Sequence, residues 1–302
     1  MIVPYTGPDL SGTAEDVFLY LRPESNGVLV ESILMGVLRG TPLFRENAKL
    51  VYLANLPGDF IIENHVVEDH YSVNYRFACR GRELFTSHMK SAFKEHFKIE
   101  FEKAEVLGSF EALKRLNMDE EKLFNIWVSD KDMMQINGQS IKKYDNLYII
   151  NYDIPALMHK NNYSTDIAVM ILRSSLEKDA FHDMVISMEH ALIEKGLMDR
   201  DKPSSRYFHY SKGPFEQILD GLGYLYNPEG KHLPFENLSF TKKLLSAGYS
   251  MDEIQGFISN PIMCFKENDV FVEDNLFLRT RHNTSGEAMD VLGSMRCQIY
   301  LK

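Results

Sequence analysis

Two stretches of the chain share one pattern, a short apolar run followed by an amphipathic helical repeat. Residues 17–22 read VFLYLR and residues 168–173 read AVMILR, and each run has the length of a buried strand. Apolar residues at helical spacing follow: Leu29, Val30, Ile33, Leu34, Val37 and Leu38 after the first run, and Phe181, Met184, Val185, Met188 and Leu192 after the second. The pattern predicts a strand and then a helix at both places.

Two other stretches predict β-hairpins. Residues 134–149 (MQINGQSIKKYDNLYI) and 263–278 (MCFKENDVFVEDNLFL) align without a gap, and both contain Asp-Asn-Leu. Asn137-Gly138 is a favoured pair for a two-residue turn in which both residues have positive φ. Residues 267–269 (END) supply turn formers at the matching position. Each stretch therefore predicts two strands joined by a tight turn.

A pair of helices is predicted before each hairpin. Residues 117–124 (NMDEEKLF) and 250–257 (SMDEIQGF) share Met-Asp-Glu, and the preceding residues, Asn117 and Ser250, are both good N-caps. In both copies a glutamate follows three residues after the cap, which is the spacing of a capping box. Shorter helical patterns precede these helices at residues 109–116 and 239–248.

The matching stretches occur in the same order along the chain, which favours an internal duplication. Residues 75–84 and 207–216 add a further match, and both predict a strand, a glycine turn and a helix start. The expected fold is α+β, with mixed α/β as the alternative. It consists of two similar halves, residues 1–150 and 151–302, related by a pseudo-twofold axis. Each half has a βα start and a helix-helix-β-hairpin end.

The two halves are expected to differ at two places. The spacing between matching stretches shrinks along the chain, so the first half is predicted to carry an insertion at about residues 41–74. At the end of the second half, residues 297–301 are expected to form a strand that closes a sheet. Burial of Ile299 and Leu301 would hold this strand in place.

The helix-helix-hairpin stretches resemble a winged helix. The resemblance covers SFEALKRLNMDEEKLFNIW with its hairpin, and SFTKKLLSAGYSMDEIQGFIS with its own, in the two halves of the chain. It implies a helix-turn-helix whose second helix would approach DNA. The second helices read MDEEKLFNIW and MDEIQGFISN, which are acidic where phosphate would lie. A structural or protein-contact role is favoured, and a nucleic-acid-associated protein is kept as an alternative.

Composition narrows the class of partner and the compartment. Lys and Arg number 33 against 43 Asp and Glu, and the net charge of -10 provides no general attraction to nucleic acid or anionic membranes. The first residues lack the pattern of a signal peptide and the apolar runs are too short to span a bilayer, so a cytoplasmic protein is expected. Cys79, Cys264 and Cys297 have no CxxC spacing, which predicts buried thiols rather than a disulfide framework or a zinc site.

The two glycine turns are the candidate anion-binding sites. Arg80-Gly81-Arg82 and Ser211-Lys212-Gly213 each place a glycine and a cation at a predicted strand-to-helix turn. Such a turn combines close backbone approach, free helix N–H groups and positive charge. The alternative is an ordinary turn with solvated basic residues, and Pro214 removes one donor from the second turn.

The predicted insertion contains the candidate metal ligands Glu63, His65, Glu68, Asp69 and His70. Imidazole and carboxylate groups suit a divalent metal or acid-base work. Their spacing matches no helical metal motif, so a polar, solvated hairpin is the favoured interpretation.

Two helical rows are weaker candidates. His182 and Glu189 share a helix face, where they are either functional or boundary residues beside the apolar stripe. Lys90, Lys94 and Lys98 form a row at helical spacing, which is either a local nucleic-acid surface or solvated charge.

No dinucleotide, P-loop, hydrolase-elbow or zincin motif occurs in the chain, and no nucleophile is paired with a base. The leading hypothesis is a non-enzymatic cytoplasmic binding or regulatory protein whose partner is another protein or a second copy, with a small anionic ligand as the alternative. A metal-dependent or phosphate-directed enzyme is the runner-up. No cofactor is predicted apart from a divalent metal as an alternative. The site is expected on the first half, between residues 41–74 and the Arg80 turn.

Overall fold

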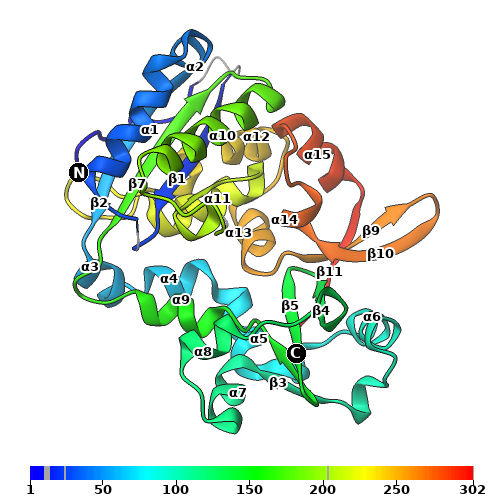
Figure 1. The fold of residues 1–302 in the computed structure, drawn as a ribbon. Coiled ribbons are helices and arrows are strands. Elements are labelled where there is room, and N and C mark those ends of the chain that lie inside the picture. Colours follow the sequence, from blue (N-terminus) through cyan, green and yellow to red (C-terminus); the bar gives the residue numbers. More distant parts are fainter. Residues whose placement is uncertain (10–13, 24, 203, 302) are drawn as a thin grey trace. The chain divides into compact units, whose positions relative to one another are not determined.

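The structure is a computed structural model that describes residues 1–9, 14–23, 25–202 and 204–301 (Figure 1). They form two compact units that are interleaved along the chain. Unit 1 contains Met1–Val66, Asn161–Ile254 and Thr280–Asp290, and unit 2 contains Val67–Lys160, Gln255–Arg279 and Val291–Lys302. Helices together with several small sheets confirm the α+β class. None of the described helices has both the length and the apolar character needed to cross a bilayer.

Unit 1 is built on a four-stranded sheet whose neighbouring strands are all antiparallel. The strands, in sheet order, are β2 (Ala48–Leu56), β7 (Ile167–Ser174), β1 (Glu15–Leu21) and β8 (Phe208–Tyr210). Helix α1 (Val28–Gly40) lies between β1 and β2 in the chain, and α10 (Lys178–Glu194) lies between β7 and β8. This order is a split β-α-β arrangement. The strand and helix predicted at both apolar runs are confirmed, and β1 and β7 are the central strands.

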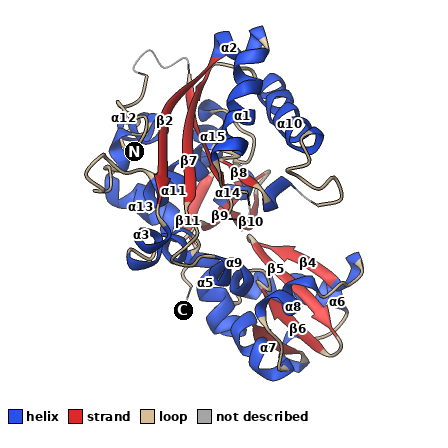
Figure 2. Cartoon of the chain, turned by 60° about the vertical axis from the view of Figure 1, so that its left-hand side comes forward, coloured by secondary structure: helices blue, strands red, loops and turns tan. Residues whose placement is uncertain are grey.

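Both faces of this sheet are covered by helices, which explains why its central strands are continuously apolar. Leu19 and Leu21 of β1 pack into the cluster that also contains residues of α1 and α10. Phe18 and Tyr20 point to the opposite face because side chains alternate along a strand. There the Tyr20 ring lies 4.6 Å from that of Tyr224, at the end of α11 (Pro214–Tyr224). Figure 2 shows α1 and α10 on one side of the sheet and α11 on the other.

Short helices complete unit 1. They are α2 (Pro42–Asn47), α3 (Gly58–Glu63), α12 (Ser239–Ser246), the first part of α13 (Met251–Ser259) and most of α15 (Ser285–Gly293).

Unit 2 contains a second four-stranded sheet. Its order is β3 (Glu105–Gly108), β6 (Leu147–Ile150), β5 (Gln139–Tyr144) and β4 (Met133–Ile136), with β3 and β6 parallel. The buried core against it is rich in aromatic rings, among them Phe77, Phe85, Phe93 and Phe101. The helices of this region are α4 (Val66–His70), α5 (Ser72–Arg80), α6 (Ser87–Phe97), α7 (Ser109–Leu116), α8 (Glu120–Asn125) and α9 (Ile154–Lys160).

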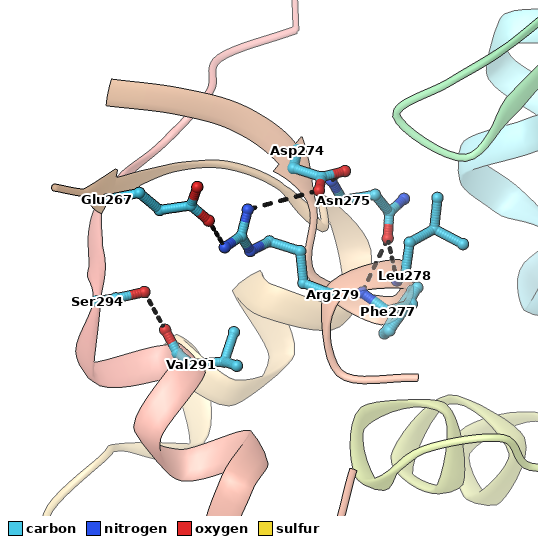
Figure 3. A network of polar contacts seen from close by, with 8 residues as sticks. All are labelled: Glu267, Asp274, Asn275, Phe277, Leu278, Arg279, Val291 and Ser294. Carbon is cyan, nitrogen blue, oxygen red and sulfur yellow. Dashed lines mark hydrogen bonds and ion pairs between the residues drawn. The ribbon is translucent and has the colours of Figure 1, made fainter. Parts of the chain in front are cut away.

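A three-stranded sheet completes unit 2. Its order is β10 (Val270–Asn275), β9 (Ile262–Glu267) and β11 (Met295–Gln298). Arg279, at the end of α14 (Leu276–Arg279), forms ion pairs with Glu267 and Asp274 (Figure 3). Its guanidinium also lies 4.5 Å from the centre of the Phe265 ring. These contacts tie the β9-β10 hairpin to the helix that follows it.

Several local predictions are confirmed. Asn137 and Gly138 have φ of 50° and 80° in the turn between β4 and β5. Residues 268 and 269 also have positive φ, and they form the turn between β9 and β10. Ser250 and Glu253 form the predicted capping box, since the carboxylate accepts from Ser250 N at 2.8 Å and the hydroxyl accepts from Glu253 N at 3.3 Å.

The strand near the end of the chain begins earlier than predicted. Residues 295–298 form β11 and pair with β9, and Ile299 N then donates to Ile262 O at 2.9 Å. Ile299 and Leu301 are partly buried against the aromatic core of unit 2. The expectation that this segment pairs with the body of the protein is confirmed.

The expected duplication is not confirmed. Residues 75–84 form helix and 3-10 turn rather than a strand, whereas residues 207–216 contain β8 and the start of α11. The supposed insertion at residues 41–74 contains β2, an integral strand of the unit 1 sheet. The expected halves 1–150 and 151–302 also differ from the interleaved units.

Two further expectations depended on the duplication. Asn117 does not cap a helix start: it is the left-handed residue that ends α7, and Asp119 caps α8 by accepting from Lys122 N at 2.8 Å. The order helix, helix, hairpin is present in both stretches. In the second stretch, α12 belongs to unit 1 and the β9-β10 hairpin to unit 2, so a winged-helix module is not confirmed there.

Candidate functional site

A cavity of about 330 Å³ lies in unit 1, where the N-terminal ends of α10, α11 and α15 meet. Each of these helices has at least nine residues. The lining residues are Glu15, Val17, Ser174, Leu176, Lys178, Asp179, Phe181, His182, Tyr210, Ser211, Lys212, Gly213, Gln217, His282, Asn283 and Thr284. The cavity therefore has an apolar part and a polar rim that includes several basic groups.

Several cations gather around the cavity without an ion pair in the described part of the chain, although the charges of Glu216 and Glu189 act on Lys212. Lys178, Lys212 and Arg281, which adjoins the lining, have no ion pair within 4 Å among the residues that the structure describes. By contrast, the carboxylate of Glu15 on the wall is bound to Lys243 at 2.8 Å and accepts a hydrogen bond from Ser285. The charge of Asp179 remains on the wall beside the cations.

The electrostatic effect of these cations is visible at His282 and Lys212. Burial lowers the pKa of His282, and the nearby charges of Arg281, Lys178, Lys212 and His182 lower this pKa further. Burial also lowers the pKa of Lys212, and Arg281 adds to that shift. The groups therefore repel one another, and a bound anion would relieve the repulsion.

A close backbone contact positions Lys212 and His282. A Cβ on Gly213 would lie 2.4 Å from the carbonyl oxygen of Thr280, so only glycine allows residues 211–213 to approach this segment so closely. The His282 N–H donates to the carbonyl oxygen of Lys212. His282 has φ of 63°, in the left-handed region, where a residue other than glycine stores strain. The contact sets both side chains on one wall of the cavity.

Two of the three helix ends present N–H groups without a side-chain cap. Helix α10 follows Glu177 and α11 follows Gly213, and neither residue caps its helix through a side chain. Pro214 at the first position of α11 has no N–H, as the sequence indicated. At α15, Thr284 and Glu287 form a capping box that satisfies the local N–H groups. The uncapped ends of α10 and α11 add positive electrostatic potential.

A buried cluster lies behind the wall and fixes residues 211–213. The Ser211 hydroxyl donates to Asp220 Oδ2 at 2.6 Å and accepts from Phe18 N at 3.1 Å. Glu216 Oε2 accepts from Lys212 N at 2.6 Å. Ser211 is buried, and its hydroxyl connects Asp220 of α11 with the backbone of β1.

His209 belongs to the same cluster. Its Nε2 lies 3.6 Å from both Glu216 Oε1 and Asp220 Oδ2, and its ring stacks on Tyr20 at 4.7 Å. Burial lowers the pKa of His209 to about 4, so the imidazole is neutral at pH 7. Burial also raises the pKa of Glu216. Desolvation therefore disfavours the charged forms of both His209 and Glu216.

The structure brings together only part of the predicted site residues. Lys212, Gly213 and His182 line the cavity. Glu189 is not part of the lining, although its negative charge acts on Lys212 and Tyr210.

The candidate residues around Arg80 lie in unit 2 and do not form the expected strand-to-helix turn. Gly81, with φ of 53°, follows the C-terminal end of α5. Arg80 pairs with Glu83 at 3.2 Å and Arg82 pairs with Glu102 at 3.0 Å. These cations already have anionic partners.

The candidate metal ligands do not lie on a hairpin. Glu63 ends α3, His65 is a left-handed residue between helices, and Glu68, Asp69 and His70 lie in α4. In the described ranges, no group of three or more His, Cys, Asp or Glu residues is placed to hold a metal ion. The expectation of a hairpin at this segment is wrong.

The lysine row on α6 is held by glutamates. Lys90 pairs with Glu102 at 2.8 Å and Lys94 pairs with Glu100 at 2.6 Å, while Lys98 is the left-handed residue that ends the helix.

Sequence reasoning missed Lys178, Arg281 and His282. One signal was available: Thr284 and Glu287 have the capping-box spacing before an apolar helical pattern, which places Arg281 and His282 just before a helix start. Their approach to residues 211–213 is a long-range contact with no local signature.

Comparison of the chain with protein-family models, with curated proteins and with solved structures gives no match. The chemistry of the cavity therefore carries the functional argument.

Proposed function

We propose that the chain is a binding protein for a small anionic ligand, with a phosphate ester as the best chemical fit, and that the cavity of unit 1 is its site. The observation that carries the proposal is the set of cations Lys178, Lys212 and Arg281, which lack ion-pair partners in the described part of the chain. A bound anion would relieve the mutual repulsion of these cations, and helix N-termini favour anions. A phosphate group accepts hydrogen bonds from several such donors at once.

The apolar wall defines the rest of the ligand. Val17, Leu176, Phe181 and Tyr210 line the cavity together with the basic groups. A volume of about 330 Å³ is at the lower end of the range for small-molecule sites. The expected ligand therefore has an apolar or aromatic part next to its anionic group.

The proposal keeps the non-enzymatic hypothesis and assigns it a ligand class. The Ser211 hydroxyl is buried and bridges Asp220 and the Phe18 amide, which gives it a structural role in the fold. A regulatory role, a protein partner and a cytoplasmic location remain predictions from the sequence.

A phosphate-directed enzyme is the second candidate, and one observation favours it. His282 adopts the left-handed conformation, and strained residues of this kind cluster at functional sites. His182 lines the same cavity, so two imidazoles are available to accept and donate a proton near a bound phosphate.

Thermal-shift measurements with phenyl phosphate, inorganic phosphate and phenol test the binding proposal. A ligand at 100 times its dissociation constant adds about 2.7 kcal/mol to the free energy of unfolding. We expect stabilisation by phenyl phosphate, a smaller effect of inorganic phosphate and none of phenol. Lys212→Gln should reduce the effect, whereas the control Lys231→Gln, on the exposed surface of unit 1, should keep it unchanged. Equal stabilisation of the Lys212→Gln variant would contradict the proposed site.

Phosphate release separates the two candidates. If the chain is an enzyme, incubation with a panel of phosphate esters will release phosphate, and His282→Gln will abolish release while retaining the thermal shift. A thermal shift without turnover by the wild-type protein supports the binding protein.

A further inference from the structure

Two of the three cysteines lie opposite each other across neighbouring strands. Cys264 of β9 and Cys297 of β11 are partners in the antiparallel register, directly after a β-bulge that shifts the register between Met295 and Cys297. Ile299 N donates to Ile262 O, so these two residues form a hydrogen-bonded pair of the ladder. Hydrogen-bonded pairs recur every two residues, and Cys297 and Cys264 lie two residues further along their strands. Opposite residues of this type have Cα atoms about 5.5 Å apart, which is within the span that a disulfide bridges. The expectation of buried thiols is wrong for all three cysteines, since Cys79 and Cys297 are exposed and Cys264 is half-buried.

The side chains of the pair are close as well as the backbones. Burial is the main cause that raises the pKa of the Cys264 thiol. The thiol of Cys297 raises this pKa further, through its charge and through a hydrogen bond. Cys79, the third cysteine, is exposed on α5 and has no place in the β9-β11 strand register.

The strands that carry the two thiols are fixed in place. Lys266 N donates to the carbonyl of Ser294 at 3.0 Å just before β11. At its other end, the Gln298 amide donates to the carbonyls of Gly256 at 2.7 Å and Asn260 at 2.6 Å. Figure 3 shows the ion pairs of Arg279 with Glu267 of β9 and Asp274 of β10. The contacts of Ser294 and Gln298 hold β11 in place on both sides of the bulge, and the bond from Ile299 N to Ile262 O continues the register that opposes the two cysteines.

We propose that Cys264 and Cys297 are a redox-modification site, at which a small-molecule disulfide of the glutathione class introduces a cross-strand disulfide. This inference rests on β-sheet register in unit 2 and does not depend on the proposed ligand cavity in unit 1.

The reaction proceeds by two thiol-disulfide exchanges. The exposed Cys297 loses its proton, and its thiolate attacks one sulfur of the reagent. A mixed disulfide forms and the first reagent thiolate leaves. Cys264 then loses its proton and attacks the sulfur of Cys297, so that the intramolecular disulfide forms and the second reagent thiolate leaves. The protein loses two electrons and two protons, and one reagent disulfide becomes two thiols.

The test uses the reduced full-length chain and oxidised glutathione, followed by alkylation, intact mass and peptide mapping under non-reducing conditions. We expect loss of two hydrogen atoms, one remaining alkylated cysteine at Cys79, and a cross-linked peptide pair containing Cys264 and Cys297. Cys264→Ser should stop at a stable glutathione adduct on Cys297. Cys79→Ser should form the same cross-link at the wild-type rate.

Two outcomes would overturn the proposal. One is persistent glutathione adducts on the wild-type protein without the cross-link, and the other is cross-linking that involves Cys79 to the same extent. The same reaction in urea provides the folding control, because selectivity for one pair must be lost when the register is lost. If Cys264→Ser does not fold, Cys264→Ala, compared by circular dichroism, replaces it.

Discussion

The two glycine turns that look alike in the sequence have opposite electrostatic surroundings in the structure. Arg80, Gly81 and Arg82 follow the C-terminal end of α5, and both arginines are bound by glutamates. Lys212 and Gly213 precede the N-terminal end of α11, and Lys212 has no ion pair within 4 Å among the described residues. A cation near a glycine is therefore a candidate for anion binding only under two conditions. The turn must precede the N-terminal end of a helix, and no carboxylate may already be paired with the cation.

Both glycines are required for a close contact between backbone segments. A Cβ on Gly81 would lie 2.7 Å from Gly108 N, and one on Gly213 would lie 2.4 Å from Thr280 O. In each case the turn packs closely on a distant backbone segment. In unit 1 that segment carries Arg281 and His282 to the cavity, whereas the contact in unit 2 joins two parts of the core.

The largest expected effect is on the free energy of unfolding, through the buried cluster of His209, Glu216 and Asp220 behind the Lys212 turn. No such cluster is described at the Arg80 turn. The pKa of His209 is about 4 in the folded state and near 6.5 in the unfolded state. The unfolded chain therefore binds the proton first, and the free energy of unfolding falls as pH decreases from 6.5 to 4. The loss is at most about 3 kcal/mol.

Chemical denaturation between pH 7 and pH 4 measures this loss, with His209→Gln as the comparison. The variant should lose less stability over the same range. Glu216 acts in the opposite direction, since its raised pKa favours the folded state once pH falls through that pKa. An identical pH profile for both proteins would show that His209 does not control acid stability.

The next effect distinguishes the two glycines. Gly213→Ala and Gly81→Ala should each lower the free energy of unfolding by about 1–3 kcal/mol, because both force a new methyl group into a backbone contact. Only Gly213→Ala should also weaken the thermal shift by phenyl phosphate. Denaturation and thermal-shift titration of both variants check this, and loss of ligand response in Gly81→Ala would break the comparison.

A smaller effect distinguishes the two cations. Lys212→Gln should weaken phenyl phosphate binding about tenfold or more, since a charge-assisted hydrogen bond contributes about 1.5–3 kcal/mol. Arg82→Gln should leave the affinity unchanged because this arginine is bound to Glu102. Isothermal titration calorimetry measures both affinities, and equal losses would point to a general charge effect.

The smallest expected effect tests whether a cation without an ion-pair partner is sufficient to bind phosphate. Glu102→Gln removes the charged partner of both Arg82 and Lys90. We expect no phosphate binding to appear, because the Arg80 turn lies at the C-terminal end of a helix, where the dipole disfavours anions. A phosphate-dependent thermal shift in this variant that is absent in the wild type would show that charge release alone makes a site.

Local features were predictable and long-range ones were not. The Asn137-Gly138 turn and the Ser250 capping box follow from residues within a few positions of each other. Residues 75–80 were misread because Tyr75, Phe77 and Cys79 alternate as in a strand. Burial of Val73 and Phe77, four residues apart, shows the helical spacing that tertiary packing selected.

The sequence predicted the residues that one of the two contacting segments contributes to the candidate site. The pattern of a strand, a lysine, a glycine and a helix identified Lys212 and Gly213 from adjacent residues. His282 and Arg281 reach the cavity through contact between residues 280–282 and 213, which no local pattern encodes. The same holds for Cys264 and Cys297, whose proximity follows from strand register.

The interleaving of the two units has a consequence for biosynthesis. The four-stranded sheet of unit 2 is formed by residues 105–150, whereas β1 of unit 1 has to wait for β7 and β8 to emerge from the ribosome. At about 5–20 residues per second, the apolar β1 strand remains without its partners for roughly ten seconds or more. During that interval the nascent chain exposes an aggregation-prone strand, and its yield in cells should depend on translation speed and on chaperones that cover β1.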